Sequence, residues 1–236
     1  MSGIHVAPDK LSEFVAAIFR AHGMSAGDAA TVAEVLVWAN LRGVESHGVM
    51  RIPSYLHFIR TGDLDPCARP TLRVLTSASF ILDCAHSAGP VAMMSASATA
   101  LKMAATSGIC MGLVSATAHT GAIGRYAEWL AERDFAAIVF VGGAPLMAYH
   151  GARTASVSTA PLAIAVPNSD GKPLLLDMAS SVVASGRIRE LAAMGKGIPE
   201  GWALDHDGNP TTDAAKAATV LPLGGPKGSS LSLLFE

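Results

Sequence analysis

The sequence predicts an α/β protein in which a helical N-terminal segment, residues 1–75, is followed by an α/β domain, residues 76–236. Apolar residues recur at helical spacing through the first third of the chain, and beyond it short β-prone runs alternate with helical ones. Half of the residues are apolar and 15% are charged, which excludes a disordered tail or a solvated charged rod.

Two amphipathic helices are expected first, around residues 11–18 and 32–39, where apolar side chains return every three or four positions. Gly23 separates them as a left-handed stop, and Ser25 with Asp28 three residues later is typical of a capping box. The second helix is expected to end at Gly43.

A third helix is expected over residues 53–59, followed by turn-forming residues at 61–66 and by Pro70. This composition places a domain boundary near residue 75. Beyond the boundary the pattern predicts helices around 91–105 and 121–134, and strands at 110–115, 136–141, 162–166 and 174–176.

The C-terminus reads as the start of a helix at Ser229 and Ser230, with large apolar side chains at 231–235 that need a partner surface. A helix that frays at a natural end is the alternative. We interpret the pattern as an α/β domain that is incomplete at its C-terminus.

Charge and cysteine usage exclude several classes of partner. The net charge is −2 and no dense Lys/Arg tract is present, so neither nucleic acid nor an anionic membrane is expected. No apolar run reaches the roughly 20 residues of a membrane helix, and no secretory leader is visible. Three cysteines at wide, irregular spacings, Cys67, Cys84 and Cys110, indicate a reducing, cytoplasmic setting.

Residues 42–51 form the densest group of chemically active side chains in a charge-poor chain. His47 can exchange a proton near neutral pH, Ser46 can orient it, and Gly48 leaves space for a ligand. Arg51 lies four positions after His47, so a helical turn would put both on one face, with the guanidinium placed to hold a carboxylate. Composition leaves open the alternative that Ser46 caps a turn and Arg51 is solvated.

Residues 115–124, with His119, Gly121 and Gly124, fall between a predicted strand and a predicted helix, where a cofactor phosphate could bind. An ordinary turn is the alternative. The glycines at 195–201 have the wrong spacing for a dinucleotide fingerprint and follow a helix, so a Rossmann fold is excluded. No metal site is expected, because residues 205–213 lack the glycine and glutamate of a calcium loop.

Taken together, these segments resemble the type-2 malate/lactate dehydrogenase family, which also includes sulfolactate and ureidoglycolate dehydrogenases and reductases of piperideine- and pyrroline-2-carboxylate. The residues that carry the resemblance are 41–48 with Arg51, 119–122, 159–161, 177–180, 199–203 with Asp205, and 225–228. The resemblance implies a mixed sheet with flanking helices, a homodimer, and hydride transfer between NAD or NADP and C2 of a small 2-hydroxy, 2-oxo or cyclic 2-imino acid.

The resemblance also implies residue roles. His47 would exchange the proton at the substrate C2 oxygen or nitrogen, Ser46 would support it, and His119 would be a rival acid/base group. Arg51 would grip the substrate carboxylate, and Thr159 would touch the substrate. The residues expected along the cofactor are His119, Thr120, Gly121, Ala122, Ile123, Asp177, Met178, Ala179 and Lys227.

Three features depart from the family pattern. Ala160 stands where members usually have asparagine, and Arg187 lies where the reductases carry the acid of a charge relay. Relatives also continue well past the Lys227 motif. The alternative expectation is therefore a catalytically inactive fragment or binding module of the same family. Arg125, Arg153 and Arg187 are the cations open as selectors of a 2′-phosphate.

Overall fold

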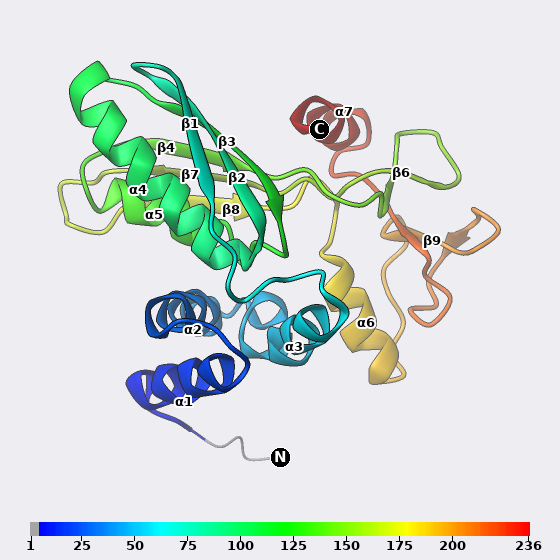
Figure 1. The fold of residues 1–236 in the computed structure, drawn as a ribbon. Coiled ribbons are helices and arrows are strands. Elements are labelled where there is room, and N and C mark those ends of the chain that lie inside the picture. The colour runs from blue at the N-terminus through cyan, green and yellow to red at the C-terminus, as the bar shows by residue number, and fades with distance from the viewer. Residues whose placement is uncertain (1–4) are drawn as a thin grey trace. The chain divides into compact units, whose positions relative to one another are not determined.

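The chain forms two compact units, Met1–Phe135 and Ala136–Glu236, and the computed structural model describes residues 5–236 (Figure 1). Both units combine helices with strands, which confirms the predicted α/β class. The expected boundary near residue 75 lies within the first unit, where helices give way to strands between Thr61 and Thr71.

The two opening helices are confirmed as α1 (Pro8–Ala21) and α2 (Ala26–Leu41). The Ser25 hydroxyl caps α2 by accepting the Asp28 N–H at 3.1 Å, and it donates to the Asp28 carboxylate at 2.7 Å. The third helix is α3 (Ile52–Thr61). The core that these helices enclose is built from Val15, Phe19, Val32, Leu36, Tyr55 and Leu64.

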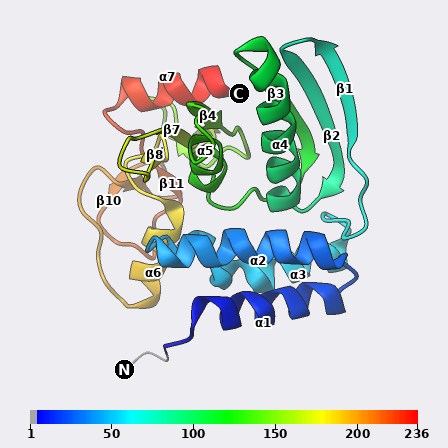
Figure 2. The same ribbon diagram turned by 90° about the vertical axis from the view of Figure 1, so that its left-hand side faces the viewer.

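The first unit contains the sheet β1 (Thr71–Thr76), β2 (Ser79–Ser87) and β3 (Met111–Thr117). β1 pairs antiparallel and β3 parallel with β2, so the sheet is mixed. α4 (Gly89–Ser107) connects β2 to β3 and lies along one face of this sheet (Figure 2). Phe80, Leu82 and Cys84 alternate toward α4. Sequence reasoning missed β1 and β2, whose connecting residues contain neither glycine nor asparagine.

The last helix of the first unit is shorter than expected. The pattern predicted a helix over 121–134, but α5 covers Gly124–Ala131. Gly121 has a φ of +73°, which is incompatible with a helix, and Asp134 has a φ of +65° just beyond the end. Residues 118–123 therefore form a loop between β3 and α5.

The second unit contains two sheets. β4 (Ala137–Phe140), β7 (Leu162–Val166) and β8 (Leu174–Met178) form an antiparallel sheet and confirm three predicted strands. The other sheet, in the order β10-β9-β11-β5-β6, was not predicted, whereas α6 is the helix expected before the glycines at 195–201. These elements are β5 (Met147–Ala148), β6 (Ala155–Val157), α6 (Ser185–Ala193), β9 (Ala203–Leu204), β10 (Pro210–Thr211) and β11 (Thr219–Val220).

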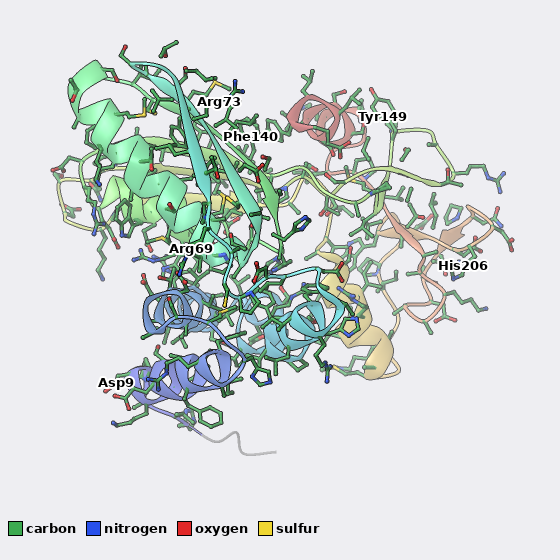
Figure 3. The ribbon with its side chains drawn as sticks, viewed as in Figure 1. Asp9, Arg69, Arg73, Phe140, Tyr149 and His206 are labelled. Atoms are coloured by element: carbon green, nitrogen blue, oxygen red, sulfur yellow. The ribbon has the colours of Figure 1, made fainter. Side chains whose placement is uncertain are left out.

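The expected C-terminal helix is α7 (Pro226–Phe235). Its Ser232 hydroxyl donates to the Ser158 carbonyl at 2.7 Å, and the Glu236 carboxylate accepts the Ser158 N–H at 2.6 Å. The ring of Phe235 stacks on Phe140 of β4, with centroids 4.7 Å apart; Figure 3 labels Phe140. Within residues 5–236, no helix has the length and apolar character to cross a bilayer.

Candidate functional site

The segment that carries Ser46 and His47 folds as two short 3₁₀ turns, η1 (Glu45–His47) and η2 (Val49–Arg51), separated by an extended Gly48. The expectation that one continuous helical turn puts His47 and Arg51 on the same face is therefore wrong. Arg51 is held near the histidine in another way, because its Nε donates to the Ser46 carbonyl at 2.6 Å.

Gly48 provides room for a side chain of the protein. Asn40, near the end of α2, accepts the Val49 N–H through its Oδ1 at 2.8 Å. A Cβ at Gly48 would lie 2.6 Å from the Asn40 Cγ, so only glycine allows this approach. The expected ligand space at Gly48 is thus filled by Asn40, which fixes the backbone directly after His47.

Ser46 contacts the imidazole instead of capping a helix. Its hydroxyl lies 3.0 Å from His47 Nδ1, and it makes no capping hydrogen bond in either 3₁₀ turn. This arrangement favours the interpretation of Ser46 as a group that orients His47 over the alternative of a simple cap.

The loop after β3 brings His119 against His47. The two imidazole rings are stacked, with centroids 5.5 Å apart and planes inclined by 28°. The buried Tyr55 of α3 has its hydroxyl 3.0 Å from His119 Nδ1 and 2.9 Å from the His119 carbonyl oxygen. The Gly121 N–H donates to the same Nδ1 at 3.2 Å.

Gly89 and Tyr126 also contact the 118–123 loop. A Cβ on Gly89, the first residue of α4, would lie 2.5 Å from the Thr120 Cα and closer still to the His119 carbonyl oxygen. The loop can therefore pack on α4 only because residue 89 is glycine. The fully buried Tyr126 donates its hydroxyl proton to the Thr120 carbonyl. Ala122 and Ile123 complete the support, since their side chains are buried.

Burial and one cation set the electrostatics of the histidine pair. Burial, and then the Arg51 guanidinium, lower the pKa of His47 from 6.5 to about 4. Burial lowers the pKa of His119 to about 3, with further contributions from Arg51 and His47. Both imidazoles are therefore neutral near pH 7.

A second group of predicted residues gathers around Ser180 in the second unit. The Thr159 carbonyl accepts hydrogen bonds from the Ser180 N–H at 2.9 Å and from its hydroxyl at 2.8 Å. The Ser180 carbonyl accepts the Leu223 N–H at 2.9 Å, just before the turn that carries Lys227. One part of the second unit thus contains Thr159, Ala179, Lys227 and the last two residues of β8, Asp177 and Met178.

The three arginines considered as 2′-phosphate selectors already have partners within the described residues. Arg125 binds Glu34 at 2.8 Å and Glu132 at 3.3 Å. Arg187 pairs with Glu190 at 2.6 Å, and Arg153 donates to the Asn209 side chain at 2.8 Å. Each of these contacts would have to be exchanged for a phosphate.

Sequence reasoning found Ser46, His47, Arg51 and His119, which the first unit brings together. It missed Asn40, Tyr55 and Gly89. Tyr55 lies four residues after Arg51 on a predicted helix, which is a usable signal, but its partner His119 is 64 positions away in the sequence. Gly89 before Pro90 also marks a helix start, yet its tight contact with the loop depends on tertiary packing.

Comparisons with known proteins agree on one family. A statistical model of the malate/L-lactate dehydrogenase family matches residues 6–236. The chain is 36% identical to malate dehydrogenase of Pyrococcus horikoshii, over 99% of this chain and 67% of that enzyme. It is 34% identical to the NAD(+) ureidoglycolate dehydrogenase of Escherichia coli, over 91% of this chain and 61% of that enzyme.

A solved structure is similar throughout the described fold. The crystal structure of delta1-piperideine-2-carboxylate reductase from Pseudomonas syringae superposes with a TM-score of 0.94 at 30% sequence identity. The match covers 99% of this chain and 71% of that one. The chain thus spans between about three fifths and seven tenths of the length of these three relatives.

Proposed function

Because the chain belongs to the malate/L-lactate dehydrogenase family of oxidoreductases, we propose that it transfers a hydride between NAD or NADP and C2 of a small 2-hydroxy or 2-oxo acid, or of a cyclic 2-imino acid. The observation that carries the proposal is the neutral His47, held by Ser46 beside the Arg51 guanidinium and stacked on His119.

The residues of the chain fit a nicotinamide dinucleotide. Lys227 is exposed at the start of α7 and makes no ion pair within residues 5–236, so its ammonium group can meet phosphate charge. Gly224 and Gly225 before it have φ values of +58° and +60°; the His150 ring covers Gly225, whereas a Cβ at Gly224 would meet only the Lys227 side chain, at 3.8 Å. Residues 119–123 and 177–179 complete the proposed cofactor contacts.

His47 exchanges the proton and Arg51 holds the substrate. When bound, the nicotinamide supplies or accepts the hydride at its C4, so a C–H bond forms at one carbon as the other breaks and two electrons move with it. In oxidation, neutral His47 takes the hydroxyl proton as the C2–O bond becomes a carbonyl; in reduction, protonated His47 returns it. Arg51 binds the carboxylate and Thr159 contacts the substrate.

Turnover with and without His47 tests this function. The purified chain is assayed with NADH and with NADPH against a panel of small 2-oxo acids and cyclic 2-imino acids. His47→Asn should lower kcat/KM by about 10²- to 10⁴-fold on every active substrate. His206→Asn, which replaces an exposed histidine in the second unit labelled in Figure 3, is the matched control. Parental turnover by His47→Asn would remove His47 from the proton transfer.

We include a homodimer in the proposal, as the family resemblance implies. Light scattering of the purified chain tests it directly: a mass of about twice 24.2 kDa is expected. A mass of one chain at micromolar concentration would contradict it.

A further inference from the structure

The two stacked histidines face hydrogen-bond partners of different kinds. His119 Nδ1 receives the Gly121 N–H, a group that can only donate. His47 Nδ1 faces the Ser46 hydroxyl, a group that can donate or accept. This difference decides which protonation states each ring can adopt without losing a hydrogen bond.

His119 is restricted to one tautomer. Since the Gly121 N–H points at Nδ1, that nitrogen must offer a lone pair, and the proton of the neutral ring is on Nε2. The Tyr55 hydroxyl donates to the His119 carbonyl oxygen at 2.9 Å and lies 3.0 Å from Nδ1, so it holds the ring in the orientation in which Nδ1 meets the Gly121 N–H. A proton on Nδ1 would oppose the Gly121 N–H directly.

His47 has no such restriction. The Ser46 hydroxyl can donate to Nδ1 while the proton of the ring is on Nε2, and it can turn to accept from Nδ1–H when the ring carries both protons. His47 can therefore gain and lose a proton while keeping its serine partner, which a group that exchanges protons with substrate requires.

We propose that Tyr55 and the Gly121 N–H are positioning groups that hold His119 as a neutral Nε2–H hydrogen-bond donor, so that proton exchange belongs to His47 alone. The assignment of proton exchange rests on the proposed function, whereas the tautomer is a property of the chain by itself. His119 then stabilises a developing negative charge by donating from Nε2, and it takes no proton from the substrate.

The groups around His47 and His119 agree with this assignment of proton exchange to His47 and hydrogen-bond donation to His119. The charged and titratable groups around His119 are Arg51, His47 and Tyr55. Burial and the Arg51 cation lower the pKa of His119 further than that of His47, to about 3 against about 4. Burial also raises the pKa of Tyr55, so its hydroxyl keeps its proton as a donor.

The tautomer can be read by NMR of the protein labelled with ¹⁵N-histidine, without cofactor or substrate. The His119 signals are assigned by their loss in His119→Gln. We expect a pyrrole-type signal for Nε2 and a pyridine-type signal for Nδ1, unchanged from about pH 5 to about pH 9. An Nδ1–H signal, or titration of His119 in this range, would overturn the proposal.

Two tyrosine variants test the positioning role. Tyr55→Phe removes a hydroxyl that meets the His119 ring, whereas Tyr126→Phe removes an equally buried hydroxyl that meets the same loop only at the Thr120 carbonyl. We expect Tyr55→Phe to shift the Nδ1 signal and to lower kcat about tenfold, with KM for the carboxylate substrate retained. Tyr126→Phe should leave the His119 ring signals at their parental positions.

Unchanged His119 signals in Tyr55→Phe, or equal shifts in both variants, would refute a role for Tyr55. If Tyr55→Phe does not fold, the tautomer of the parental protein still decides whether His119 is held as the Nε2–H donor. Because the NMR measurements need no turnover, failure of the proposed oxidoreductase function does not alter their result.

Discussion

In the proposed mechanism, Arg51 links substrate binding to proton transfer. Its guanidinium is held by the Ser46 carbonyl and lowers the pKa of both neighbouring histidines. A bound carboxylate would offset this positive charge, so substrate binding should itself make His47 easier to protonate. Burial, and then this cation, thus keep His47 neutral in the free protein, and a bound carboxylate would reduce the contribution of the cation.

The pH dependence of catalysis follows from this electrostatic arrangement. In the proposed mechanism, oxidation of a 2-hydroxy acid requires neutral His47, and burial followed by the Arg51 cation lowers the pKa of His47 to about 4. We therefore predict that kcat/KM for oxidation is constant near neutral pH and falls as the pH drops through about 4. A fall centred near the ordinary histidine pKa of 6.5 would contradict the assigned environment.

Removal of the Arg51 charge should change both properties together. Arg51→Gln is expected to raise KM for the carboxylate substrate about 10- to 100-fold, and to move the acidic limb of the oxidation profile to higher pH. Steady-state kinetics across the pH range measures both effects. Arg60→Gln, at an exposed position in the last turn of α3, is the control and should change neither.

At the scale of single residues, the sequence predicted the site residues that lie in clusters of chemically active side chains. Ser46, His47 and Arg51 stand out in a chain with few charges, and His119 lies at a strand-to-helix junction. Asn40 and Tyr55 did not stand out, because a polar residue on a helix has no visible role until its partner is known. Their partners, Val49 and His119, are fixed by tertiary structure.

Among the elements, the contact between the start of α4 and the 118–123 loop positions His119. Gly89 is the point of closest approach, and the loop backbone leaves no room for a methyl group there. The position of His119 therefore depends on α4, although the helix contributes no side chain with acid/base chemistry at this point.

Gly89→Ala tests this contact. The new methyl group must displace the loop backbone, so we predict a loss of about 1–3 kcal/mol in the free energy of unfolding, together with reduced kcat. Gly27→Ala is the matched control in the first turn of α2, where a Cβ meets only the Ser25 hydroxyl at 4.0 Å. It should leave stability unchanged or raise it by up to about 1 kcal/mol in urea unfolding.

The elements that sequence reasoning predicted are those with a strong local signal. α1 has apolar residues along one face, α2 and α4 are rich in apolar residues over four turns or more, and α2 has a serine cap. The strands of the second unit's five-stranded sheet are two or three residues long, so their pairing is decided by tertiary packing instead of by local pattern. β1 and β2 lack a glycine or asparagine turn signal between them.

For the molecule as a whole, the partly buried histidine pair couples stability to pH. Both folded pKa values lie below 6.5, so the folded state binds fewer protons than the unfolded chain. The stabilisation is fully present above the unfolded pKa and is lost as the pH falls toward the folded values of about 4 and about 3.

We predict that the free energy of unfolding decreases by about 2 kcal/mol per histidine between about pH 7 and about pH 5. Urea unfolding at the two pH values measures the difference, which His119→Gln should reduce relative to the parental protein. An equal pH dependence in the parental protein and in His119→Gln would show that His119 is not the buried neutral group described.

The α/β class and the family were accessible from the sequence, because motifs in a fixed order carry them over nearly the whole chain. The division into two compact units after residue 135 was not accessible from the sequence. The change from helices to strands near residue 75 is a local signal, whereas the extent of a compact unit depends on which elements pack together.

The most direct test of the central claim is a titration of this chain with NADH and, separately, with NADPH, followed by nicotinamide fluorescence. We predict saturable binding of one or both, weakened about tenfold by Lys227→Ala and unaffected by Lys172→Ala, which replaces another exposed lysine of the second unit. The absence of saturable binding of either cofactor by the folded chain would contradict its function as a nicotinamide-dependent oxidoreductase.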